Sequence, residues 1–136
     1  MRIRDKIKKP QRPVVAYEIL PPREKDGTLN SYAETISSLL SQTHIDAINI
    51  PEVHDEVGRG DRPVVNQKRG EPREFGMLLQ DIVGIEAIIN RVVVHDPYDR
   101  QMKWLEETNT KYEIENMIIV GGESSKVSYP GPTVNE

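Results

Sequence analysis

The chain has 136 residues, of which 36% are hydrophobic and 29% are charged, and its formal net charge is −4. This length suits one domain with a core of its own. The absence of cysteine excludes a disulfide scaffold, a thiolate metal site and a cysteine nucleophile. No apolar run is long enough to cross a bilayer, and none follows residues 1–6 that would make a signal peptide. We therefore expect a cytoplasmic protein without a membrane partner.

Basic residues are concentrated at the start of the chain. Residues 1–12 hold six basic side chains and one acid, Asp5, so their charge is +5 and the remainder carries −9. Clustered Lys and Arg can contact nucleic-acid phosphates. However, the chain has one Phe and one Trp, and no aromatic residues alternate with the basic ones to stack on bases. We interpret residues 1–12 as a solvated basic tail and expect no nucleic-acid partner.

The first fifty residues predict a strand, a helix and a second strand. The apolar run 14–20 is β-branched at its start and is closed by two prolines, which is typical of a buried strand. Apolar residues at positions 33, 36, 39 and 40 have the spacing of one helix face. Asn30 or Ser31 has the residue type of its N-cap. Residues 45–50 then form a short apolar run that ends at Pro51.

A long polar segment, residues 52–73, separates this unit from the next. Loops of that length are uncommon in compact domains and are usually functional or mobile. Apolar residues at positions 75, 78, 79 and 82 then predict a helix that ends near Gly84. Residues 85–95 predict a third strand, which closes on His95.

The last predicted helix begins after Asp96 and Pro97, which suit an N-cap and a first helical position. Its inner side is expected to carry three residues: Met102, Leu105 and Tyr112. Residues 117–120 predict a fourth strand, followed by two glycines.

Strands and helices alternate along the chain, and the apolar strands lack clean polar alternation. This pattern is typical of parallel strands covered by helices. An open doubly wound sheet and half of an eight-stranded barrel both fit it. Residues 121–136 predict no further element, and an eight-stranded barrel needs about 250 residues. We therefore predict an α/β fold that is a partial (β/α)8 TIM barrel, with about the first four strands and three helices, in a truncated chain.

Four ionisable residues stand at or just after the ends of the predicted strands: Glu18, Glu52, His95 and Glu123. Functional groups gather at the C-terminal ends of parallel strands. Each residue alone also has a structural explanation, as an exposed strand end, a helix cap or part of a turn. Four of them at one end of a sheet favour a site there.

Glu18 is the main candidate for acid–base chemistry. Its apolar neighbours in residues 17–22 would desolvate the carboxyl and favour the protonated form, which can act as a general acid. Gly121 and Gly122 would let the backbone approach a ligand closely, because glycine has no Cβ. A metal site is the alternative, although a hydrated acidic loop also explains most of its four potential ligands: Glu52, His54, Glu56 and His95.

Taken in order, these segments resemble the methylenetetrahydrofolate reductase family. Residues 17–22 (YEILPP) resemble the family's aromatic-Glu-x-x-Pro-Pro signature, and residues 91–95 (RVVVH) its third strand with a terminal His. Residues 116–123 (NMIIVGGE) resemble its fourth strand and Arg-Gly-Asp loop, and residues 129–132 (YPGP) the tyrosine-bearing stretch beyond it. The resemblance spans residues 13–134 and covers the first half of the family's barrel.

The resemblance implies a barrel that binds FAD at the C-terminal ends of its strands. The family passes hydride from NAD(P)H to the flavin and then to methylenetetrahydrofolate, giving methyltetrahydrofolate in one-carbon metabolism. It implies that Glu18 is the acid that assists opening of the folate's one-carbon ring, and that Glu123 is the carboxylate beside the flavin and the pterin. The cofactor-binding residues that it implies are His95, Gly121, Gly122, Glu123 and Tyr129.

The chain also departs from the family pattern. Gly121 replaces the loop arginine, Glu123 is one methylene longer than the usual aspartate, and residues 50–52 lack the usual threonine. These differences indicate a divergent branch. We interpret residues 13–136 as the N-terminal half of a flavin-binding reductase domain and expect a homo-oligomer or a partner subunit. The alternatives are a metal-dependent TIM-barrel enzyme and a non-catalytic half-barrel module.

Overall fold

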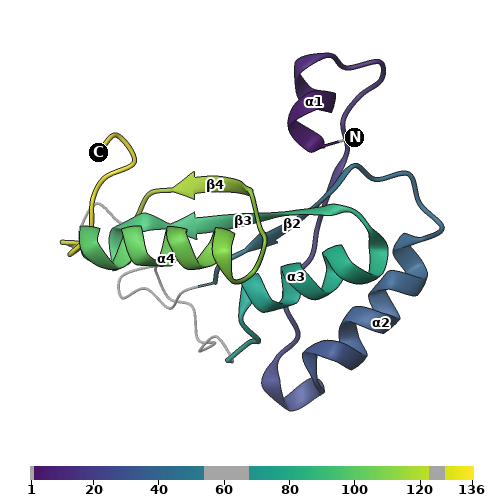
Figure 1. Cartoon of the computed structure of the whole chain (residues 1–136). Helices are drawn as coiled ribbons and strands as arrows, with labels where there is room; N and C mark the ends of the chain where they lie inside the picture. The colour runs from purple at the N-terminus through teal and green to yellow at the C-terminus, as the bar shows by residue number, and fades with distance from the viewer. Residues whose placement is uncertain (1, 54–67, 123–127) are drawn as a thin grey trace, which may run out of the picture.

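The computed structural model describes residues 2–53, 68–122 and 128–136 (Figure 1). Within these ranges the chain forms one four-stranded sheet, all parallel, in the order β1-β2-β3-β4. The strands are β1 (Ala16–Glu18), β2 (Ala47–Pro51), β3 (Glu86–Val92) and β4 (Asn116–Val120). The α-helices are α1 (Ile3–Lys8), α2 (Leu29–Leu40), α3 (Pro72–Val83) and α4 (Tyr98–Thr110), and the 3-10 helices are η1 (Glu24–Asp26) and η2 (Val93–His95).

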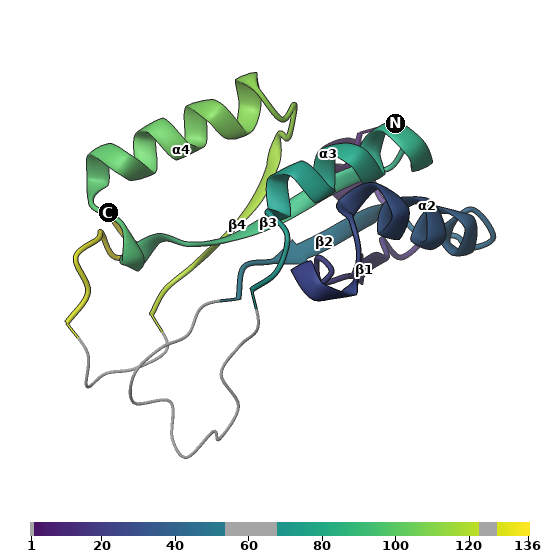
Figure 2. The ribbon, with the colours of Figure 1, turned by 90° about the horizontal axis from the view of Figure 1, so that it is seen from below.

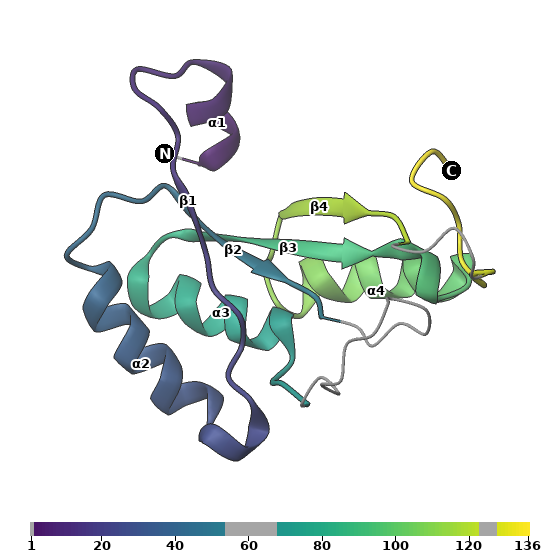
Figure 3. The ribbon, with the colours of Figure 1, turned by 180° about the vertical axis from the view of Figure 1, so that it is seen from behind.

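The helices α2 and α3 lie on one side of the strands, and α1 lies on the opposite side (Figures 1 and 3). Seen from below, α2 and α3 stand in front of the strands, and α4 lies along the outer side of β3 and β4 (Figure 2). We call the side that α2 and α3 cover the helix face, and the opposite side the open face. The predicted α/β class with parallel strands is confirmed.

The core lies between the helix face and the helices. Ile48, Ile50 and Ile89 point to the helix face and are fully buried. Phe75 and Leu79 of α3 are fully buried as well. Burial of such side chains is the main favourable term in folding. Glycine ends α3 as expected, because Gly84 has a φ of 72°, in the left-handed region.

Several element boundaries differ from the predicted ones. β1 covers only residues 16–18, and all three are exposed, because it is an edge strand of the described sheet. The N-cap of α2 is Thr28, whose side chain accepts a hydrogen bond from the Ser31 backbone N–H, instead of Asn30 or Ser31. β3 ends at Val92, and the chain turns into η2 before it reaches the predicted strand end.

The inner side of α4 also differs from the prediction. Met102 is 48% exposed, and Tyr112 lies beyond the end of the helix, although its side chain is buried. Pro97 takes the N-cap position, so the helix begins at Tyr98. Leu105 is half-buried, as is Trp104. Three residues of α4, Gln101, Trp104 and Thr108, pack against two buried arginines, Arg73 and Arg91.

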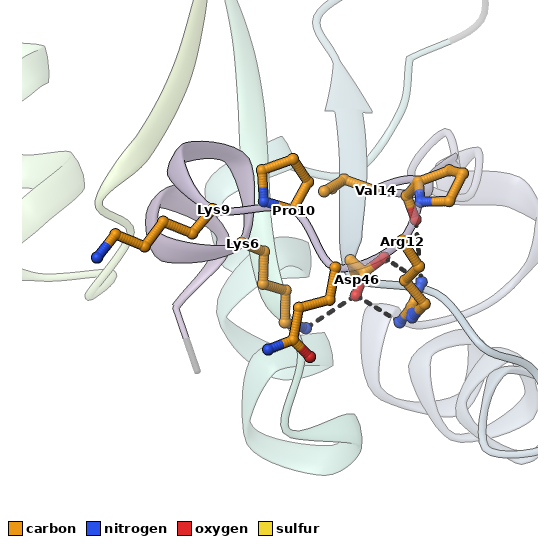
Figure 4. A pocket seen from close by; sticks show the side chains of 8 residues that line it. Lys6, Lys9, Pro10, Arg12, Val14 and Asp46 are labelled. Carbon is orange, nitrogen blue, oxygen red and sulfur yellow. Dashed lines mark hydrogen bonds and ion pairs between the residues drawn. The ribbon is translucent and has the colours of Figure 1, made fainter.

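The basic N-terminal segment is mostly exposed, but it is structured and held to the rest of the chain. It contains α1, whose Ile3 is buried, and it is held by Asp46, which precedes β2. The Asp46 carboxylate accepts hydrogen bonds from Lys6 at 2.9 Å, from Arg12 at 2.8 and 2.9 Å, and from the Val15 backbone N–H at 2.9 Å. Figure 4 shows the Lys6 and Arg12 side chains converging on it. Three of the basic side chains of residues 1–12, those of Arg2, Lys6 and Arg12, are therefore paired with acids outside this segment.

The described helices are too short or too polar for any of them to cross a membrane.

Candidate functional site

Glu18 lies at the C-terminal end of β1 on the open face. It is paired in register with Asn49 of β2, and the Asn49 Nδ2 donates a hydrogen bond of 3.2 Å to the Glu18 Oε2. The Glu18 side chain is exposed, so the desolvation expected from its apolar neighbours does not occur in this structure. The reason is the position of β1 at the sheet edge, where Ile19 turns into the core while Glu18 does not.

Three of the predicted cofactor residues come together beyond β3 and β4. The rings of His95 and Tyr129 meet edge to face, with centroids 5.6 Å apart and planes at 80°. Gly122 lies directly against Tyr129, because a Cβ at Gly122 would fall 2.2 Å from the Tyr129 Cε2. A Cβ at Gly121 would lie 3.3 Å from the Val134 Cγ2, a less close approach. The close approaches that these glycines permit are therefore made by the chain's own C-terminal segment.

Gly131 anchors this C-terminal segment to η2. Its backbone N–H donates a hydrogen bond of 2.9 Å to the Val94 carbonyl. A Cβ at this position would lie 2.3 Å from the Asp96 carbonyl oxygen and 2.5 Å from that of Val93, so only glycine fits. The contact fixes Tyr129 beside His95, and it places two segments that are far apart in the sequence at one end of the sheet.

A buried arginine supports this end of the sheet from the helix side. Arg91 of β3 is 5% exposed. Its guanidinium donates to the Glu52 Oε1 at 2.8 Å, to the Asp96 Oδ2 at 2.7 Å and to the Gln101 Oε1 at 3.0 Å. Its Cζ lies 4.4 Å from the centroid of the Trp104 ring. Arg91 thereby ties the end of β2, the residue after η2 and α4 to one another.

Sequence reasoning missed this role of Arg91. The available signal was a lone charge inside the apolar run 88–94, which is a costly position unless the charge is paired. Glu52, a candidate metal ligand, is such a partner: its Oε1 pairs with Arg91, and its Oε2 accepts from the Val92 backbone N–H at 2.9 Å. Glu52 therefore serves as an anchor of the strand ends.

The predicted site residues do not form a single cluster. Glu18 lies on β1 and His95 follows β3, so β2 lies between their strands, although both residues stand at the same end of the sheet. Glu123, His54 and Glu56 lie outside the described residues. Among the residues that the structure describes, no group of three or more acidic or histidine side chains is arranged to hold a metal ion.

Comparison of the chain with models of known protein families finds no matching family, and comparison with curated protein sequences finds no match.

Proposed function

We propose that the chain is the N-terminal part of a flavin-dependent methylenetetrahydrofolate reductase, whose sheet supplies the first four strands of a (β/α)8 barrel. One observation carries the proposal. His95, Gly122 and Tyr129, which the family resemblance assigns to the cofactor, come from separate segments and meet at the C-terminal ends of β3 and β4. The strand order, in which each strand pairs with its neighbour in the sequence, is also the order that a barrel requires.

The residues at this end of the sheet suit a planar cofactor. The edge-to-face pair of His95 and Tyr129 offers ring surfaces and polar ring atoms to an isoalloxazine, and both segments are fixed by backbone contacts. FAD, when bound, supplies the hydride chemistry between NAD(P)H and methylenetetrahydrofolate. The part assigned to this chain is to bind and orient the cofactor and to deliver a proton.

Glu18 is the residue proposed for the proton delivery. Its carboxyl lies on the open face at a strand end, where Asn49 holds one of its oxygens at 3.2 Å. Asn49 fixes the orientation of the carboxyl and leaves the other oxygen, Oε1, to carry the proton. In the proposed role, Glu18 protonates the folate nitrogen that is released when the one-carbon ring opens.

The first experiment tests cofactor binding. FAD is titrated into the chain and into His95→Ala, with His44→Ala as the matched control, because His44 is an exposed histidine between α2 and β2 at the other end of the sheet. We expect the FAD dissociation constant to rise about 10-fold or more in His95→Ala, which corresponds to about 1.4 kcal/mol. His44→Ala should match the parent chain. Absence of FAD binding, or equal effects of the two variants, would refute the proposed cofactor site.

The second experiment tests Glu18 in the flavin-loaded protein. Glu18→Gln should leave flavin reduction by NAD(P)H intact and slow the reduction of methylenetetrahydrofolate about 100-fold, the usual scale for loss of general acid catalysis. Glu34→Gln, an exposed glutamate of α2, is the control and should affect neither half-reaction. Equal loss in both half-reactions would mean that Glu18 has a structural role.

A further inference from the structure

Two asparagine side chains on the open face have an unmet hydrogen-bonding need. Among the described residues, the Oδ1 atoms of Asn49 and Asn90 are buried and have no hydrogen-bond donor. Asn49 is paired in register with Ile88 of β3, and Asn90 follows Ile88 by two positions. Strand residues two apart point to the same face, so the two amides are neighbours on adjacent strands. Asn49 also contacts the carboxylate of Glu18 on the neighbouring strand β1.

The orientation of one amide is fixed by its surroundings. The Asn49 Nδ2 donates to the Glu18 carboxylate, which accepts hydrogen bonds when ionised, so the Oδ1 of this amide is turned away from Glu18. A buried acceptor without a donor destabilises a protein, because its hydration is lost and nothing replaces it. Such atoms are rare in native proteins, and two on neighbouring strands indicate donors that the described residues do not supply.

Two isoleucine side chains lie beside the amides on the open face. Ile88 is the in-register partner of Asn49 and precedes Asn90 by two positions on β3, and Ile118 of β4 is paired in register with Asn90. Ile118 is 45% exposed on this face. A planar ring that rests on the two isoleucines would bury their side chains and bring its edge to the amides. An asparagine amide both accepts and donates, which matches a ring edge where an N–H stands beside a carbonyl.

We propose that Asn49 and Asn90 bind the N–H edge of a pyrimidinone ring lying on the open face beside Glu18. This inference rests on the proposed function, because flavins and pterins are the two heterocycles of that reaction and both carry a pyrimidinone N–H. The Asn90 Oδ1 accepts the ring N–H, and its Nδ2 donates to the adjacent ring carbonyl. A flavin edge has a single N–H, which Asn90 takes; in a pterin the 2-amino group beside that N–H offers Asn49 a second donor. Asn49 can then accept from the ring while its Nδ2 holds Glu18, so that one residue aligns the ring with the acid.

Binding of matched heterocycles tests the recognition. Riboflavin and 6-methylpterin are each titrated calorimetrically against the chain, together with the derivatives in which the ring N3–H is replaced by N-methyl. We expect one parent heterocycle to bind about 10-fold or more tightly than its N-methyl derivative, because the methyl group removes the donor and leaves the amide oxygen unpaired. The heterocycle that shows the preference identifies whether the flavin or the pterin occupies the face. In Asn90→Leu the preference should disappear.

The thermal midpoint of the ligand-free chain is a second readout. Replacing an asparagine that stabilises the fold would lower this midpoint, whereas replacing a ligand-binding asparagine with an unpaired oxygen would not. Asn90→Leu removes an unpaired polar group, so its thermal midpoint should be unchanged or higher by up to about 5 °C. Asn116→Leu is the matched control on the same face, because the Asn116 Nδ2 donates to the Glu86 Oε1 at 3.3 Å. That variant should have a lower midpoint than the parent chain.

Three results would overturn the inference. They are equal or absent binding within both pairs of heterocycles, a preference that survives in Asn90→Leu, and a midpoint that falls in Asn90→Leu as it does in Asn116→Leu. These results are distinct from failure of the proposed function. FAD binding that depends on His95 can persist when Asn90 does not bind a ring N–H. Likewise, a preference for the pterin over its N-methyl derivative that depends on Asn90 can persist when FAD does not bind.

Discussion

Replacing Arg91 with methionine should strongly destabilise the fold, because Arg91 supports the end of the sheet that carries the candidate site. The Arg91 side chain is 6% exposed and pairs with Glu52, which is 10% exposed, and with Asp96, which is 34% exposed. Methionine keeps much of the side-chain volume but removes the charge. It leaves the Glu52 carboxylate nearly buried without its cation, and it removes one of the two guanidinium groups stacked on Trp104.

The expected loss follows from that burial. Removing one partner of a buried ion pair costs about 3–5 kcal/mol, mainly because the remaining charge is uncompensated. Small domains have a total unfolding free energy of about 5–15 kcal/mol, so the loss is a large share of it. The matched control is Arg100→Met, which removes another cation from Asp96. Arg100 is 77% exposed and lies 3.8 Å from that carboxylate, so the control should lose no more than about 1 kcal/mol.

Urea denaturation followed by circular dichroism at 222 nm measures both losses without relying on the tryptophan. Trp104 is the only tryptophan, so its emission in the native state separately reports whether the stack with Arg91 is intact. Adding Glu52→Gln to Arg91→Met should recover about 1 kcal/mol or more, because the second change removes the uncompensated charge. Equal stability of Arg91→Met and Arg100→Met, or no recovery in the double variant, would refute this account of the arginine.

Three further variants test other parts of the fold. The pKa of Asp46 is lowered by three groups: the Val15 backbone N–H, Lys6 and Arg12. The stabilising contribution of Asp46 is therefore full above the ordinary carboxyl pKa of about 4 and is lost as the pH falls through the lowered pKa. Asp46→Asn should be less stable at pH 7, and its urea midpoint should depend less on pH in the acid range. Gly131→Ala should release the C-terminal segment to limited proteolysis, whereas Gly84→Ala, whose Cβ would meet nothing within 4 Å, should not. Leu79→Ala should cost about 2–5 kcal/mol in urea denaturation, and Leu39→Ala, which is 59% exposed on α2, should cost far less.

The helix over residues 72–83 could be predicted from the sequence because its signals are local. The apolar spacing that begins at Phe75 and the glycine that ends the helix act within a turn or two, and the structure confirms both. The same reasoning placed Ala33 and Leu40 correctly on the inner face of α2, but it also placed Leu39 there, which is exposed. One helical step separates adjacent residues by 100°, so two consecutive leucines cannot both point to the centre of the contact.

Contacts between distant residues account for what the sequence did not reveal. The inner face of α4 carries Gln101 and Thr108, which hydrophobic periodicity cannot identify, because they face the buried Arg91 and Arg73. The helix α1 is similarly hidden, since six residues rarely predict a helix without the partners that hold them. For the candidate site, the family resemblance predicted a role for His95, Gly122 and Tyr129, and only the fold shows that Tyr129 lies against both of the others.

The strand edges of the described sheet carry the last prediction. β4 is an edge strand with two exposed isoleucines, Ile118 at 45% and Ile119 at 43%, and they point to opposite faces. Parallel sheets are normally buried on both faces, and an unpaired edge with apolar neighbours recruits another strand. We therefore expect the 136-residue chain to self-associate, with a light-scattering mass that rises with concentration. Ile119→Lys should reduce this association, because the added charge opposes pairing at the edge. Ile82→Lys, at an isoleucine of α3 that is 48% exposed, should not. A monodisperse monomer with a cooperative melt would show that the edges are already satisfied and that the open face needs no second layer.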